Sequence, residues 1–134
     1  MEKLFNTVSI IIGLAGGFMV KIFGGFDKVM CVLMGMMVLD YISGLVKAIH
    51  QKELSSEIGY KGLLKKIVIL IVVAAANMVQ QIISDSIPIR EIVIMFYVAN
   101  EGISILENAT SVTDIIPEKF KEVLLQLRQG NSKE

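Results

Sequence analysis

Ionisable side chains lie inside several of the most apolar stretches of this chain. Asp40 interrupts "MMVLDYISGL", and Glu101 and Glu107 stand within "FYVANEGISILENA". An acid at the centre of a membrane-spanning helix costs about 2.5–3.5 kcal/mol on insertion scales. Such groups must face a partner or water. Their chemistry would be pairing between helices, proton transfer, or the lining of an aqueous path.

The composition favours a small membrane protein over an enzyme. The 134 residues suit a single domain, 1–134, and 54% of them are apolar. Charged residues make up 19%, against about 25% in ordinary soluble domains. The formal net charge is zero, which gives no argument for binding nucleic acid.

Known catalytic and metal-binding patterns are absent from the sequence. Cys31 and His50 are the only cysteine and histidine, so a metal site built from such ligands is nearly excluded. There is no phosphate-binding loop and no nucleophile–base pair. We therefore expect no enzymatic activity, no metal and no cofactor.

Four apolar stretches are long enough to cross a bilayer, which takes about 17 to 25 residues. They run from Leu4 to Val20, Val29 to Ile49, Ile67 to Ile83, and Ile87 to about Ala109. A domain of this size cannot hide four helices that are apolar almost all round. The sequence predicts an all-α polytopic membrane protein with about four spans, or three if the first does not cross.

The first stretch allows two interpretations. A cleaved signal peptide is one, although the segment lacks a basic start and a small-residue cleavage site. A spanning helix is the other, in which Ser9, Gly13 and Gly17 form a ladder of small residues suited to close helix contact.

The distribution of lysine and arginine predicts the orientation. The segment from His50 to Lys66 carries most of the basic residues between spans, and more follow in the C-terminal tail. Basic residues stay on the cytoplasmic side. Four spans with both termini in the cytoplasm satisfy this rule.

Polar residues form stripes along three of the predicted helices. In the fourth stretch they fall within an arc of about 120° at 100° per residue. The stripes supply these candidates for a lumen or a contact between subunits: Asp40, Lys47, Asn77, Gln81, Arg90, Tyr97, Asn100, Glu101, Ser104, Glu107 and Asn108.

Two interpretations of the stripes remain open. Amides and hydroxyls can hold a bundle together, at about 0.6 kcal/mol each. Alternatively, the polar faces of a homo-oligomer turn toward a shared, water-filled lumen. For Glu101 the candidate partners are Lys47 and the Arg90 of a staggered neighbour.

The tail, about 115–130, is typical of a short amphipathic helix. One face would carry Ile116, Phe120, Val123, Leu124 and Leu127, with Pro117 in the first turn. It could lie on the cytoplasmic surface of the membrane or pack against a copy of itself.

Four segments together resemble the bacteriophage holin family, which includes toxin-secretion holins. They are "VLDYISGLVKAI", "ELSSEIGYKGLLKKI", "NEGISILENA" and "IPEKFKEVLLQL", within residues 35 to 130. The resemblance implies a protein that accumulates in the lipid bilayer of the bacterial cytoplasmic membrane, forms homo-oligomers, and opens lesions that release an endolysin or a toxin. It implies no catalytic residue.

Two other functions stay open from the residues alone. A small four-helix transporter could exchange protons for an ion or drug, with Glu101 or Asp40 as proton carrier. A passive scaffold could anchor a partner through its basic loop. Release of a folded protein from vesicles would distinguish a holin from both the transporter and the scaffold.

Overall fold

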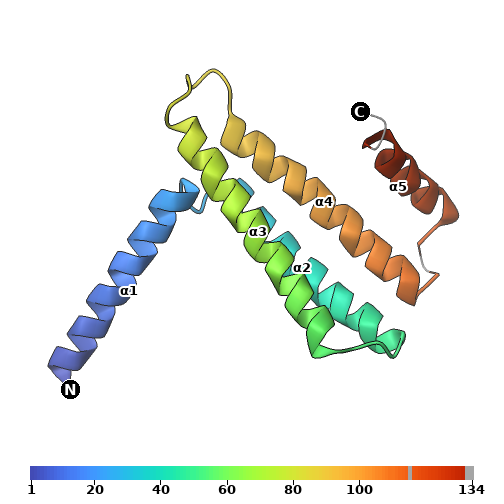
Figure 1. Ribbon diagram of the computed structural model, residues 1–134, viewed down its shortest axis with the longest axis horizontal. Helices are drawn as coiled ribbons and strands as arrows, with labels where there is room; N and C mark the ends of the chain where they lie inside the picture. The colour runs from blue at the N-terminus through green and yellow to red at the C-terminus, as the bar shows by residue number, and fades with distance from the viewer. Residues whose placement is uncertain (115, 132–134) are drawn as a thin grey trace.

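The computed structural model describes residues 1–114 and 116–131, and it confirms the all-α class (Figure 1). Within these residues the chain forms five helices. They are α1 (Glu2–Phe23), α2 (Lys28–His50), α3 (Ser56–Gln80), α4 (Ile89–Val112) and α5 (Glu118–Asn131).

Helices α2, α3 and α4 form an up-down-up bundle, in which α4 packs most extensively against α2. Short connections impose this arrangement, because only Gln51–Ser55 separate α2 from α3. Asp27 and Ser55 begin α2 and α3, since each side chain accepts a hydrogen bond from the backbone N–H three residues later. The Ser55 cap places the start of α3 well before Ile67, so that most of the predicted basic loop is helical.

The centre of the bundle is an apolar cluster, defined here as Met30, Leu33, Met37, Ile69, Val73 and Ile94. Their spacing of three, four or seven residues within each helix places them on one face. Within a bilayer such a cluster is stabilised by close packing, because lipid tails are as apolar as the side chains.

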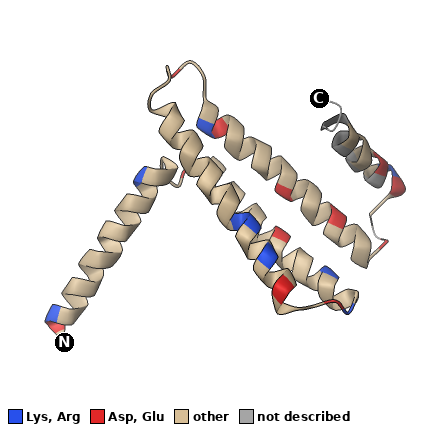
Figure 2. Cartoon of the chain, in the orientation of Figure 1, with Lys and Arg blue, Asp and Glu red and all other residues tan. Residues whose placement is uncertain are grey.

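Helix α1 diverges from the bundle, and only its C-terminal end approaches the other helices (Figure 1). None of its residues is buried. Its charged residues lie at its two ends, and the length between them is uncharged (Figure 2).

Three helices, α1, α2 and α3, are long and apolar enough to cross a membrane. Helix α4, with 24 residues, is of similar length, but its charged residues include the buried Arg90 and Glu101. The number of spans is therefore three or four, depending on α4.

Helix α5 follows a turn after α4 (Figure 1). It begins at Glu118, so Pro117 lies just before the helix and not in its first turn. Phe120 and Val123 from the predicted apolar face are exposed. The side chains of Leu124 and Leu127 lie outside the described part of the chain, as does the backbone at 115 and 132–134.

Candidate functional site

A charge layer crosses the bundle next to the apolar cluster, and we define it as Asp40, Lys66 and Glu101. Each residue comes from a different helix, and each lies near the middle of that helix. The Lys66 ammonium donates to the carboxylates of both Asp40 and Glu101. The exposed fractions of the three side chains are only 8%, 8% and 1%.

The helical periodicity places these charges on the buried faces. Asp40 follows Met37 by three residues, and Lys66 precedes Ile69 by three, so both charges continue the stripe of the apolar cluster. On α4, Glu101 lies seven residues, or about two turns, after Ile94. The helices that pack the cluster therefore bring the charges together.

The charge layer contains two carboxylates and one ammonium. Glu101 Oε1 is buried and accepts no hydrogen bond from any described residue. Lys66 is thus shared by two acids, and one acid oxygen is left without a donor. Such an arrangement depends on its single cation, because a buried charge without a partner is strongly destabilising.

The structure corrects both partners that the sequence suggested for Glu101. Lys47 is half-buried and lies further along α2, while the Glu101 partner is Lys66. Arg90 pairs with Asp27 and Glu91 of its own chain. The sequence does not single out Lys66, because it stands beside Lys65 at the border of an apolar run and is typical of a basic loop. Its spacing of three and seven residues from Ile69 and Val73 is the signal that would have found it.

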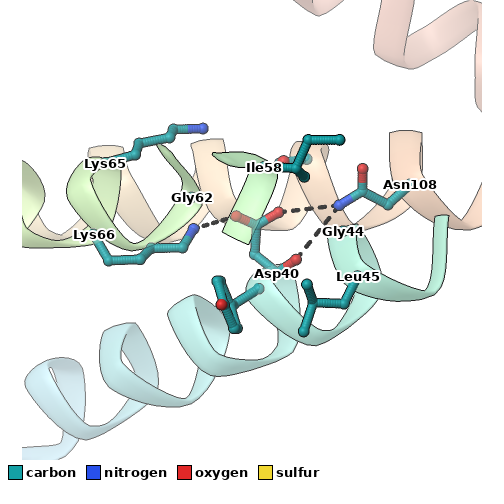
Figure 3. Close-up of a pocket in the computed structure, with 10 residues that line it drawn as sticks. Asp40, Gly44, Leu45, Ile58, Gly62, Lys65, Lys66 and Asn108 are labelled. Atoms are coloured by element: carbon teal, nitrogen blue, oxygen red, sulfur yellow. Dashed lines mark hydrogen bonds and ion pairs between the residues drawn. The ribbon is translucent and has the colours of Figure 1, made fainter. Parts of the chain in front are cut away.

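Asn108 extends the charge layer toward the α2–α3 loop. Its side-chain amide donates to the Ser43 hydroxyl at 3.0 Å, and it lies 3.4 Å from Asp40 Oδ1 (Figure 3). Gly44 lies next to this contact, and a Cβ there would be in ordinary van der Waals contact, at 3.7 Å, with the Asn108 amide nitrogen. The predicted stripes of α2 and α4 therefore meet at this point.

A second polar group, the Arg90 hub, lies at the opposite end of the bundle. The Arg90 side chain is buried, and its five N–H donors all have acceptors. The Nε atom donates to the Phe23 carbonyl at 2.6 Å, and Nη2 donates to the Gly25 carbonyl at 3.0 Å. The remaining donors reach Asp27 at 2.9 and 3.1 Å and Glu91 at 3.2 Å.

Asn77 completes the hub from α3 by donating to the carbonyls of Lys21 and Ile22 at 3.1 and 2.8 Å. Together with the N–H groups of Gly24 and Gly25, which bond to Val20, these donors satisfy the last four carbonyls of α1. A cation there also suits the negative end of the helix dipole. Asp27 lies just before α2, outside the helices. The hydrogen bonds from Arg90 lower the pKa of its carboxyl group below the ordinary value.

Of the remaining candidates, Ser104 lines a small pocket together with Asp40. Tyr97 packs against the apolar cluster, with its ring 5.3 Å from that of Phe96. Gln81 is the exposed C-terminal cap of α3. Asn100 and Glu107 are half-buried on α4. Ser9, like the rest of α1, is not buried. A Cβ on Gly13 or Gly17 would meet no atom within 4 Å.

Long apolar helices that enclose a layer of paired charges define a polytopic helical membrane protein. Residues 17–129 match the model of the bacteriophage holin family, and this chain belongs to that family.

The curated relatives extend this assignment. An uncharacterized 14.9 kDa protein of Clostridium perfringens is 38% identical over 95% of this chain and 97% of its own length. An uncharacterized protein of Listeria monocytogenes is 45% identical over 78% of this chain and 74% of its own. A probable holin of Bacillus phage phi105 is 30% identical over 80% and 79%. No solved structure matches the chain.

Proposed function

We propose that this protein acts as a holin that accumulates in the bacterial cytoplasmic membrane, assembles into homo-oligomers and opens lesions. Through these lesions an endolysin or an exported toxin would leave the cell. The observation that carries the proposal is the family match over residues 17–129, supported by the similarity to a probable phage holin.

The charge layer is consistent with a state in which single copies accumulate in the membrane before any lesion opens. Lys66 is neutralised by Asp40 and Glu101 within one chain, so a single copy can rest in lipid without exposing its charges. The apolar cluster packs the bundle between the charge layer and the Arg90 hub. A single copy would thus be closed across its middle.

The same groups could line an opening in an assembly. If the helices of many copies separate, the polar faces of α2 and α4 gain water in place of their internal partners. Asp40, Glu101, Ser104 and Asn108 would then face the lumen. Helix α1, which is unburied in its own chain, would supply contacts between copies through Ser9, Gly13 and Gly17.

Release from vesicles tests this function. Purified protein is reconstituted at increasing density into liposomes that contain a small dye and a folded fluorescent protein. We expect both to be released above a threshold density, because lesions pass folded proteins. A proton-coupled transporter would move only small ions, and a scaffold would release nothing, so either outcome contradicts the proposal.

A further inference from the structure

A pocket of about 190 Å³ opens beside the charge layer, on the side away from the apolar cluster. Its wall includes the buried Asp40 and Lys66 together with Ser104 and Asn108. Figure 3 shows Asp40 at its centre, between Lys66 of α3 and Asn108 of α4. Three helices therefore contribute polar groups to one small space.

A second pocket continues this space toward the α2–α3 loop. It measures about 330 Å³ and shares Gly44, Ile58 and Asn108 with the first. Its wall also includes Gln51 and Glu53, which lie in the loop itself. The two pockets therefore adjoin along these shared residues, one near the mid-helix charges and the other near the loop end of the bundle.

Small residues keep this space open. Gly44 and Gly62 face it from α2 and α3, and a Cβ on Gly62 would lie 3.3 Å from the Tyr41 ring. Larger side chains at these positions would fill the pocket or press against its neighbours. The space is therefore maintained by the local sequence.

The chemistry of the wall favours water over lipid tails. Lipid tails offer no hydrogen bonds, whereas the buried Asp40 and Lys66 are charged. The two carboxylates take two of the three N–H donors of Lys66, which leaves one for a ligand. At a liquid volume of about 30 Å³ each, the first pocket has room for about six waters.

The opposite end of the space is closed by the apolar cluster. Met37 precedes Asp40 by one turn on α2, and Ile69 follows Lys66 by one turn on α3. Met37 and Ile69 are nearly fully buried, with exposed fractions of 5% and 3%. Water entering from the loop end would therefore stop at the charge layer.

We infer that each single chain contains a water-filled vestibule, formed by these two pockets, that is open at the α2–α3 loop and ends at Asp40 and Lys66. Its ligands are water and small hydrophilic solutes. The vestibule is a property of one copy before assembly, so it does not require the lytic role to be correct.

Reaction of introduced cysteines tests the vestibule. In a Cys31→Ser background, Ser104→Cys is reconstituted at low density and treated with a small, charged, membrane-impermeant thiol reagent from each side in turn. Gln51→Cys marks the loop side and Ser86→Cys, between α3 and α4, marks the other side. We expect Ser104→Cys to react from the Gln51 side and not from the Ser86 side.

Three further variants control this result. Leu39→Cys, on the exposed outer face beside Asp40, should react only with a membrane-permeant maleimide. Leu45→Cys gives an independent position on the pocket wall. Adding Gly44→Leu to Ser104→Cys should abolish labelling, because the new side chain fills the entrance.

Labelling of neither Ser104→Cys nor Leu45→Cys from the Gln51 side would overturn the vestibule. Labelling from the Ser86 side would overturn it as well, since the space would then cross the apolar cluster. Liposome release is scored separately at high density. The vestibule and the lytic function can therefore fail independently.

Discussion

At the scale of single residues, Lys66 differs from the acids that it joins. Removing Lys66 leaves two buried carboxylates without a cation, and breaking a buried pair in this way costs about 3–5 kcal/mol. Replacing one acid by its amide leaves a balanced pair of one ammonium and one carboxylate. The charge layer should therefore tolerate loss of an acid far better than loss of the lysine.

Substitution of Lys66 tests this asymmetry. We expect Lys66→Met to lower the amount of protein in the membrane and the thermal stability of purified protein. The matched control is Lys65→Met, because Lys65 is the adjacent lysine and is exposed. Both quantities are measured by quantitative immunoblotting and by thermal unfolding in detergent.

A neutral charge layer should recover the loss. The triple variant Asp40→Asn, Lys66→Met, Glu101→Gln removes every charge from the layer and should accumulate better than Lys66→Met alone. Lys47→Met should behave like the wild type, since Lys47 is not the partner of Glu101. Equal damage from Lys65→Met and Lys66→Met would show that the layer does not depend on its shared cation.

Two of the three charges in this layer, and Asn108 beside them, could be predicted from the sequence for a physical reason. Asp40, Glu101 and Asn108 are polar within apolar runs, so their cost in lipid marks them. Lys66 stands at the border of an apolar run, where a lysine normally faces the headgroups. Only the cap at Ser55, which extends α3 by nearly three turns before Lys66, places it inside the bundle.

At the scale of helices, the Arg90 hub joins the ends of four of them. Arg90 donates to the Phe23 carbonyl at the end of α1 and to the Asp27 cap of α2. Asn77 of α3 donates to the Ile22 carbonyl of α1. Gly24 makes this possible because its φ of 76° suits glycine, and a Cβ there would collide with Asn77 and Arg90. The hub thus fixes the direction in which α1 leaves the bundle.

Substitution of Gly24 should release α1. We expect Gly24→Ala to cost about 1–2 kcal/mol for the left-handed backbone alone, and more for the collision. Spin labels at Ile12 on α1 and Ile92 on α4, both exposed, should give a narrow distance distribution that broadens in the variant. Gly35→Ala is the matched control, because a Cβ there meets no atom within 4 Å. Equal distributions in all three proteins would contradict a structural role for the hub.

Helix α1 also carries the prediction for assembly. We expect Gly13→Leu to weaken crosslinking between copies and to delay lysis, because a bulky side chain separates closely packed helices. Protein level should not change, since nothing in its own chain lies within 4 Å of the added Cβ. Unchanged crosslinking together with unchanged lysis timing would show that the ladder of small residues is incidental.

The helices themselves were predictable, whereas their arrangement was not. The apolar runs from Leu4 to Val20 and from Val29 to Ile49 lie within α1 and α2, because apolar length alone selects a helix in lipid. The divergence of α1 depends on hydrogen bonds from Arg90 and Asn77 to backbone carbonyls. Every residue has the same backbone carbonyl acceptor, so no pattern of residue types predicts which carbonyls Arg90 and Asn77 bond to.

At the scale of the whole molecule, the two ends of the bundle differ in unpaired positive charge. The end near the α2–α3 loop carries Lys52 and the exposed Lys61 and Lys65, of which Lys61 pairs with Glu57. The other end carries the exposed Lys21 and Lys28, whereas Arg90 there is neutralised by Asp27 and Glu91. The internal pairing of Arg90 therefore strengthens the asymmetry that the sequence already indicates.

This asymmetry argues for an α2–α3 loop in the cytoplasm, because basic residues near spanning helices are retained there. If α1 and α4 both cross, the two termini share that side, whereas an α4 that does not cross would place the C-terminus opposite the α2–α3 loop. In a Cys31→Ser background, an impermeant maleimide applied to intact cells before lysis should label Ser86→Cys. The reagent should not label Ser56→Cys or Ser132→Cys until the membrane is permeabilised.

External labelling of Ser56→Cys would show that the α2–α3 loop lies outside, which is the opposite orientation. External labelling of Ser132→Cys alone would show that the C-terminus lies outside, which would contradict an α4 that crosses the membrane.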